Sequence, residues 1–348
     1  MSIYHIGSVK PKEASGLVKE VYQELKQEMG DVVEPVSLHA LEPTVLREVW
    51  GMLREILLID DHMLRREKEA VAAAVSSSNA CPYCVDAHTI MVMGLDDAQT
   101  AKAIAKKDLS LITDSPLRGL LEWAFHTRDF DQLRPVENKY LGKALPELIG
   151  TVVFFHYLNR MVTLFLGATI LPMNVPMMKG MMKKMAAMMF SKVLKTKKEG
   201  RTLADGETLD LFQQYPMHWA NSNTRVHYAL AKAQQTTQAL AKDYLPEEIR
   251  SFVVSQIQAW DGQDLESTRE MEAALLKVEE EYRDVARVLL HTAMCDYRVQ
   301  GKDIQLLKEH FGGKDEAALV LTSWVSMVAA IEIGNRLGDR MAEGVPVA

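Results

Sequence analysis

The sequence has few of the features that mark a membrane-spanning, secreted or nucleic-acid-binding protein. It contains no uncharged apolar run of about 18 residues, so we expect no membrane span. Its first residues, Met1 to His5, lack the apolar segment of a signal peptide, and we expect a cytoplasmic protein. The formal net charge is −7 and the pI is near 5.9, which gives no reason to expect nucleic acid as a partner.

Signals for β-strands are also scarce. Aromatic residues make up 7% of the chain, and β-branched residues form no clear alternating run. Apolar residues instead recur at helical spacing, as Leu46, Val49 and Trp50 do after Pro43. We therefore predict an all-α fold. With 348 residues, of which 48% are hydrophobic, the chain is long enough for two domains.

Cysteine is rare, with three residues in the whole chain, which suggests a reducing compartment. Two of them, Cys81 and Cys84, enclose Pro82 and Tyr83, and His88 follows four residues after Cys84. Pro82 suits the first turn of a helix, where a missing N–H costs nothing. Cys81 is then expected near the N-cap, and residues three or four apart share a helix face. The pattern places Cys81, Cys84 and His88 on one stripe.

The stretch before this motif is predicted to end one helix and to cap the next. Residues 76–79, Ser-Ser-Ser-Asn, follow an apolar helical run that contains Glu69, and their side chains are capping groups. A helix N-terminus and a nearby imidazole both favour the thiolate, which is the reactive form of cysteine. A second thiol can convert a sulfenic acid to a disulfide, and His88 can transfer the proton. Glu69 is a candidate to orient His88 or to relay its proton through water.

Two other interpretations of the motif remain open. Cys81, Cys84 and His88 supply three zinc ligands, and the fourth would have to be Glu69 or a distant residue. The sequence has no second CxxC and no HxxxH to complete an ordinary structural zinc site. The cysteines can also be inert core residues. Cys295, which follows a histidine at position 291, has no second thiol beside it and is interpreted as a core or incidental cysteine.

The four-residue constellation resembles the alkylhydroperoxidase D-like / carboxymuconolactone decarboxylase superfamily. The family pattern is a glutamate twelve residues before a CxxC and a histidine four residues after its second cysteine, and Glu69, Cys81, Cys84 and His88 match it. The resemblance implies that Cys84 attacks the peroxide, that Cys81 resolves it, and that Glu69 and His88 form the proton relay. It implies no metal and no cofactor. Tyr83 departs from the pattern, because some members carry a second histidine there.

The resemblance also implies a function and partners. We expect a thiol-dependent (alkyl)hydroperoxide reductase or disulfide oxidoreductase in antioxidant defence, which takes a hydroperoxide and is reduced by a dithiol protein or a low-molecular-weight thiol. Relatives with this fold form homo-oligomers, and we expect one here. One alternative is a carboxymuconolactone decarboxylase-like enzyme, although those members do not rely on a CxxC. The other is a non-enzymatic scaffold that binds zinc or senses redox state.

A second stretch, Tyr157-Leu158-Asn159-Arg160, resembles the last helix of the same family, which packs against the CxxC helix. His156 could approach the site from there, but we interpret it as a satisfied core or surface histidine.

The second half of the sequence weakly echoes the first, which predicts two tandem helical bundles of the alkylhydroperoxidase D-like type. Pro35 and Pro216 lie 181 residues apart. When the two halves are aligned at this offset, Arg250 stands at the position of Glu69 and Leu265 at the position of Cys84. The second copy therefore lacks the chemical groups of the first. We predict a domain with the CxxC site at residues 1–170, a connector at 171–208 and a degenerate domain at 209–348.

The connector is rich in methionine and lysine at roughly helical spacing. It is predicted to be an amphipathic helix packed on the body or on a neighbouring subunit, with a membrane-surface or partner-docking helix as the alternative. Residues 197–206 are predicted to be an exposed linker. The methionines are Met173, Met177, Met178, Met181, Met182, Met185, Met188 and Met189.

Overall fold

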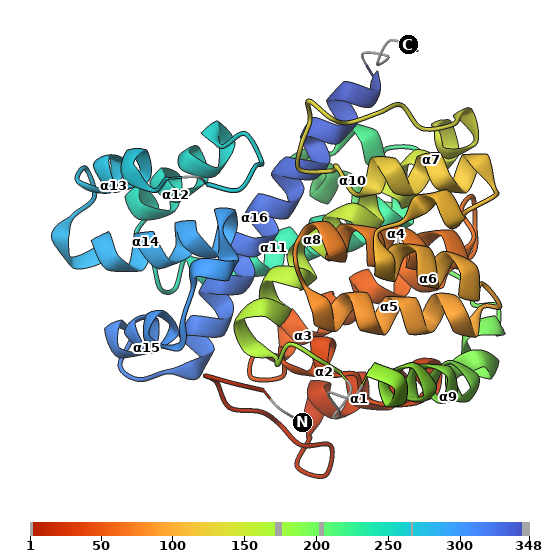
Figure 1. Cartoon of the computed structure of the whole chain (residues 1–348). Coiled ribbons are helices and arrows are strands. Elements are labelled where there is room, and N and C mark those ends of the chain that lie inside the picture. Colours follow the sequence, from red (N-terminus) through yellow and green to blue (C-terminus); the bar gives the residue numbers. More distant parts are fainter. Residues whose placement is uncertain (1–2, 171–175, 202–204, 266, 343–348) are drawn as a thin grey trace.

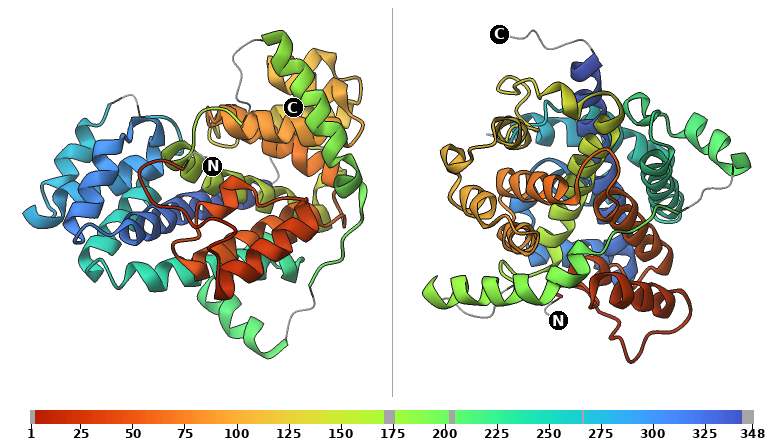
Figure 2. Two further views of the ribbon diagram at one scale, coloured as in Figure 1. Left: turned by 90° about the horizontal axis from the view of Figure 1, so that it is seen from below. Right: turned by 90° about the vertical axis from the view of Figure 1, so that its right-hand side faces the viewer.

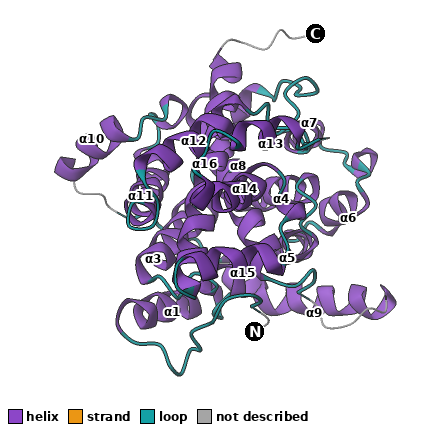
Figure 3. Ribbon diagram, turned by 90° about the vertical axis from the view of Figure 1, so that its left-hand side faces the viewer, coloured by secondary structure: helices purple, strands orange, loops and turns teal. Residues whose placement is uncertain are grey.

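The fold consists of α-helices joined by short connections (Figures 1 and 3). The computed structural model describes residues 3–170, 176–201, 205–265 and 267–342. Within these ranges there are sixteen α-helices and no strand, only an isolated bridge between Ile3 and Leu166. The prediction of an all-α protein is confirmed. The helices are α1 (Gly16–Met29), α2 (Glu34–Ser37), α3 (Pro43–Met52), α4 (Arg65–Ser78), α5 (Pro82–Gly94), α6 (Ala98–Lys106), α7 (Ser115–Ala124), α8 (Leu145–Phe165), α9 (Pro176–Lys195), α10 (Asp205–Gln214), α11 (Thr224–Ala241), α12 (Glu247–Ala259), α13 (Arg269–Leu275), α14 (Glu280–Met294), α15 (Gly301–His310) and α16 (Asp315–Ala342).

Two long apolar helices, α8 and α16, pack against each other at the centre of the molecule (Figure 1). Both the Gly142–Phe165 segment and α16 are long and apolar enough to cross a membrane by length and composition. However, 94% and 89% of their most apolar windows are buried inside the protein. A helix that is apolar on all sides suits a position surrounded by other helices. These two helices therefore supply the core.

The two halves of the chain lie on opposite sides of this central pair. In Figure 1, α4 to α7 lie on the right and α12 to α15 on the left. α3 packs against α11, so helices from the two halves also touch each other directly. The buried apolar side chains form one continuous cluster that runs through both halves. The boundaries at residues 170 and 208 and the tandem repeat stay predictions.

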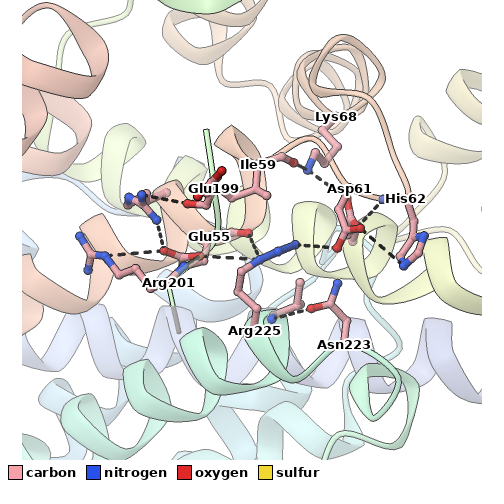
Figure 4. Close-up of polar contacts among 12 residues, drawn as sticks. Glu55, Ile59, Asp61, His62, Lys68, Glu199, Arg201, Asn223 and Arg225 are labelled. Atoms are coloured by element: carbon pink, nitrogen blue, oxygen red, sulfur yellow. Dashed lines mark hydrogen bonds and ion pairs between the residues drawn. The ribbon is translucent and has the colours of Figure 1, made fainter. Parts of the chain in front are cut away.

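A buried carboxylate ties the first half to the second half and to the connector (Figure 4). Glu55 lies in a π-helical turn, Leu53–Leu58, that continues α3, and it is 6% exposed. Its carboxylate lies 3.7 Å from the Nε of Arg201 in the connector and 3.7 Å from the Nε of Arg225 in α11. Arg225 also reaches Asp61, with Nη2 3.3 Å from Oδ2. A buried carboxylate needs cations around it, which these two arginines and the neighbouring Arg54 provide.

The connector forms a helix that lies at the edge of the molecule, beside α5 (Figures 2 and 3). The predicted connector helix is thus present as α9. Met173 and residues 202–204 lie outside the described residues, as do the side chains of Met177 and Met178. The predicted linker extends too far, because Asp205 and Gly206 belong to α10.

Candidate functional site

The two helices that carry the site, α4 and α5, meet in a tight reversal. The prediction that the first helix ends within residues 76–79 is confirmed, because α4 ends at Ser78 and Asn79 is its C-cap. The prediction that these side chains cap the second helix is wrong, because no side chain caps α5. The serines remain in the helix because this end of α4 is buried against other helices. The chain turns at Asn79 and Ala80, and Ala80 takes a left-handed φ of 52°. Cys81 is the N-cap of α5, as predicted, and its N–H donates to the Ser76 carbonyl at 2.9 Å.

The two thiols of the motif are buried and lie against each other. Cys81 is 2% exposed, Cys84 is 1% exposed, and both are free thiols. Burial, together with the hydrogen bond and charge of Cys81, raises the pKa of Cys84 well above its usual value. A hydrogen bond with Asn159 opposes this rise. The expectation that the helix N-terminus and the imidazole would favour the Cys84 thiolate is therefore wrong for the resting structure, because desolvation is the larger effect.

Glu69 and His88 form a close pair between α4 and α5. The Nδ1 of His88 lies 2.6 Å from Oε2 of Glu69, and Arg65 donates from Nε to the other carboxylate oxygen at 3.2 Å. Burial raises the pKa of Glu69, but the hydrogen bond and charge of His88, with help from Arg65, hold it below its usual value. The ring of Phe155 packs edge-on against the imidazole, with centroids 4.5 Å apart. Among the described contacts, none joins His88 to either thiol.

A network of hydrogen bonds that involves α8 and the turn after α7 surrounds Asn159, which bonds to Cys84. Asn159 donates from Nδ2 to the Ser76 hydroxyl at 3.0 Å, and its Oδ1 accepts from Asn79 Nδ2 at 2.9 Å. Asn79 Nδ2 also lies 3.1 Å from Nδ1 of His156, whose Nε2 lies 3.0 Å from the Thr127 hydroxyl. The Nδ2 atom of Asn79 can only donate hydrogen bonds. The amide group of Asn159 must therefore turn its acceptor, Oδ1, toward Asn79. The N–H groups of Asn159 then point toward Ser76 and Cys84.

His156 lies between Asn79 and Thr127 in this series of hydrogen bonds and is a buried, neutral group. Burial, with the nearby charges of Arg160 and Arg128, lowers its pKa well below the usual value. Both ring nitrogens have partners, so its interpretation as a satisfied core histidine is confirmed. Sequence reasoning missed Asn159 as a neighbour of Cys84. The signal was present, since Asn159 lies three residues after His156 and shares its helix face.

Tyr83, at the position where some relatives carry histidine, donates its hydrogen bond to α2 and not to a thiol. Its hydroxyl donates to Oε2 of Glu34 at 3.2 Å, and the residue is 4% exposed. Burial and the Glu34 charge raise the pKa of this phenol. Tyr83 thus ties α5 to α2.

In the second half, Cys295 is also buried, and burial raises its pKa to about 11.

The motif supplies Cys81, Cys84 and His88 as three zinc ligands, with Glu69 as the candidate fourth. In the part of the chain that the structure describes, no group of three or more His, Cys, Asp or Glu side chains is arranged to hold a metal ion. Glu69, the candidate fourth ligand, already binds Arg65 and His88.

No protein-family model matches the chain. The chain is similar to a protein of Mycobacterium tuberculosis (strain ATCC 25618 / H37Rv) named alkyl hydroperoxide reductase Rv2159c. The two are 28% identical over 351 residues, which cover 98% of this chain and 96% of the relative. The similarity therefore extends over both halves and the connector. It supports the alkylhydroperoxidase D-like resemblance of the motif and an oxidoreductase kind of activity.

Proposed function

We propose that this protein is a thiol-dependent hydroperoxide reductase in which Cys84 is oxidised, Cys81 resolves it, and Glu69 and His88 transfer the proton. The observation that carries the proposal is the 2.6 Å contact between His88 and Glu69, made by the same two helices that frame two adjacent thiols. The full-length similarity to a protein named alkyl hydroperoxide reductase supports the same reaction class.

The relay has a defined direction. Glu69 is held as a carboxylate, so Nδ1 of His88 is the nitrogen that carries a proton toward it. The basic lone pair of the imidazole then lies on Nε2. Because burial raises the pKa of Cys84, few thiolates form spontaneously, and His88 must remove the proton, directly or through a water. Asn159 donates a hydrogen bond to the sulfur and stabilises the charge that develops there.

The cycle balances without a metal or organic cofactor. The Cys84 thiolate attacks one peroxide oxygen, the O–O bond breaks, and the alkoxide takes the proton from His88 to leave as an alcohol. The resulting Cys84 sulfenic acid condenses with the Cys81 thiol, which forms a disulfide and releases water. An external dithiol protein, or two low-molecular-weight thiols, then reduces this disulfide by thiol–disulfide exchange.

Access to the thiols requires a local movement. Both cysteines are almost completely buried, whereas Pro82 between them is exposed at the surface. The reversal at Asn79 and Ala80 is the short segment whose displacement uncovers Cys81 and Cys84 together. The reductant can attack a sulfur atom only after this displacement. We propose that the displacement limits turnover.

Mass spectrometry with differential alkylation tests the cycle. Metal-free protein is analysed before and after one equivalent of an organic hydroperoxide. We expect a Cys81–Cys84 disulfide in the wild type, none in Cys84→Ser, and a persistent Cys84 sulfenic acid in Cys81→Ser. Cys295→Ser serves as the matched control and should behave as the wild type. Unreactive thiols, or protein that is purified with stoichiometric zinc, would refute the proposal and favour a structural role for the motif.

A further inference from the structure

The helix α9 is fixed on the CxxC helix by one of its faces. Ala187 and Leu194 are buried, and they pack so closely on Gly94 of α5 that a Cβ there would lie 2.5 Å from Leu194 Cδ1. Two ion pairs flank this contact. Lys183 Nζ lies 2.6 Å from Oδ1 of Asp86, and Lys195 Nζ lies 2.6 Å from Oδ2 of Asp96. Because these contacts set the rotation of α9, its opposite face is held toward solvent.

That outer face is unusually apolar. Met181, Met185, Met188 and Met189 are 62%, 60%, 79% and 76% exposed. They account for four of the ten large apolar side chains that are exposed among the described residues. Their spacing, with steps of four, three and one, places them on one side of the helix. Scattered exposed apolar residues are ordinary, but a contiguous set on one helix indicates a binding surface.

The same face is cationic. Lys184 lies between Met181 and Met185, and Lys192 follows Met189 by three residues. Both lysines are exposed, and within the described residues neither forms an ion pair. From Leu171 to Lys198 the sequence contains seven lysines and no aspartate or glutamate, in a chain whose formal net charge is −7. Positive charge is therefore concentrated on one helix at the edge of an acidic protein (Figure 3). We call the set Met181, Lys184, Met185, Met188, Met189 and Lys192 the Met–Lys face.

We propose that the Met–Lys face docks the protein on the surface of an anionic lipid bilayer. Exposed thioether side chains can enter the boundary between headgroups and acyl chains, while lysines extend to lipid phosphates. Residues 171–198 contain no acidic side chain that an anionic surface would repel, and the neighbouring Asp96 is paired with Lys195. The face is presented by a single helix at the edge of the molecule, which lets it lie flat on a membrane.

A bilayer fits this face better than a second copy of the chain. A symmetric contact through α9 would bring Lys184 and Lys192 close to their own counterparts, with no acidic side chain on the helix to compensate them. Protein interfaces are depleted of lysine relative to the rest of the surface, whereas this face carries two. The anionic headgroups of a bilayer instead supply a partner to every lysine. The inference is independent of the thiol cycle, because it uses none of the residues of that site.

Vesicle cosedimentation of the full-length protein tests the proposal. Vesicles of phosphatidylcholine are compared with vesicles that also contain phosphatidylglycerol. We expect binding to the anionic vesicles to be at least about tenfold stronger and to weaken steeply with added salt. The double variant Lys184→Glu/Lys192→Glu should lose this preference, and Met185→Ser/Met188→Ser should weaken binding at every salt concentration. Circular dichroism and urea unfolding verify that each variant is folded.

Matched controls come from exposed residues elsewhere on the surface. Leu276→Ser removes an apolar side chain that is 70% exposed, and Lys302→Glu reverses an exposed charge, so both should bind vesicles as the wild type does. Equal affinity for the two kinds of vesicle, no binding to either, or unchanged binding of the Lys184→Glu/Lys192→Glu variant would overturn the proposal. So would a vesicle-free dimer in light scattering that Met185→Ser/Met188→Ser dissociates, because that result assigns the face to a second copy.

Discussion

The imidazole of His88 and the carboxylate of Glu69 lie 2.6 Å apart, although the residues are 19 positions apart in the chain and belong to different helices. The pair is possible because α4 and α5 pack closely along their length. Arg65, one turn before Glu69 on α4, holds the other carboxylate oxygen. The carboxylate is therefore oriented from two sides, which fixes the ring of His88.

Loss of the Glu69 charge should impair the relay. In Glu69→Gln the amide cannot hold His88 with Nδ1 protonated as a carboxylate does, so we expect the rate of peroxide-driven Cys84 oxidation to fall about a hundredfold. Stopped-flow measurement with an organic hydroperoxide follows this rate. The control, Glu20→Gln, alters an exposed carboxylate on α1 and should have no effect. A Glu69→Gln rate within a factor of two of the wild type would remove Glu69 from the mechanism.

The alkylation of Cys84 should depend on pH in a way that reveals its burial. Since burial raises the pKa of Cys84, the thiolate fraction should still be rising where an ordinary thiol, with a pKa of about 8.5, approaches its plateau. We expect the rate of iodoacetamide modification, followed at Cys84 by mass spectrometry, to increase without a plateau up to about pH 10, where an ordinary thiol has levelled off. A synthetic peptide of residues 76–90 supplies the unfolded reference. A plateau in the folded protein at lower pH than in the peptide would contradict this prediction.

Asn159 should lower the pKa of Cys84 through its N–H group. In Asn159→Asp the shape is retained, but a carboxylate would face the sulfur, so thiolate formation should decrease and neutral-pH oxidation should slow at least about tenfold. Raising the pH should restore part of the rate, which a merely structural defect would not do. Asn138→Asp adds the same charge at an exposed position and should leave the rate unchanged. A pH profile of Asn159→Asp identical to that of the wild type would rule out this role.

The absence of a side chain at Gly94 should be essential for the packing of α9 on α5. A Cβ there would lie 2.5 Å from Leu194 Cδ1 and 3.0 Å from the Ala187 carbonyl, so α9 must shift in Gly94→Ala. We expect a loss of about 1–3 kcal/mol in the free energy of unfolding, with faster hydrogen exchange in residues 180–198. Gly119→Ala, where the added methyl meets nothing within 4 Å, should instead be neutral or stabilising by up to about 1 kcal/mol. Urea unfolding of both variants measures the difference. Equal stabilities would show that α9 does not pack on Gly94.

The local pattern of the sequence determined much of the site. Helical periodicity predicted the all-α fold, and Pro82 predicted that α5 begins beside Cys81. Helix periodicity and helix starts could be predicted because they depend on interactions between residues a few positions apart. The set Glu69, Cys81, Cys84 and His88 was singled out by its resemblance to a known family, and the structure brings Glu69 and His88 into contact. The tandem repeat and its boundaries stay predictions.

The tertiary structure decided the properties that depend on packing between helices. The sequence could not show that burial would outweigh the helix N-terminus and raise the pKa of Cys84, because desolvation depends on every neighbour of the sulfur. Nor could it place Asn159 of α8 beside a cysteine 75 residues earlier in the chain. The outward direction of Met185 and Met188 likewise follows from the contact of α9 with Gly94. The sequence by itself determined which groups are present and which helices carry them, whereas only the packing of those helices decided their ionisation, their partners and their exposure.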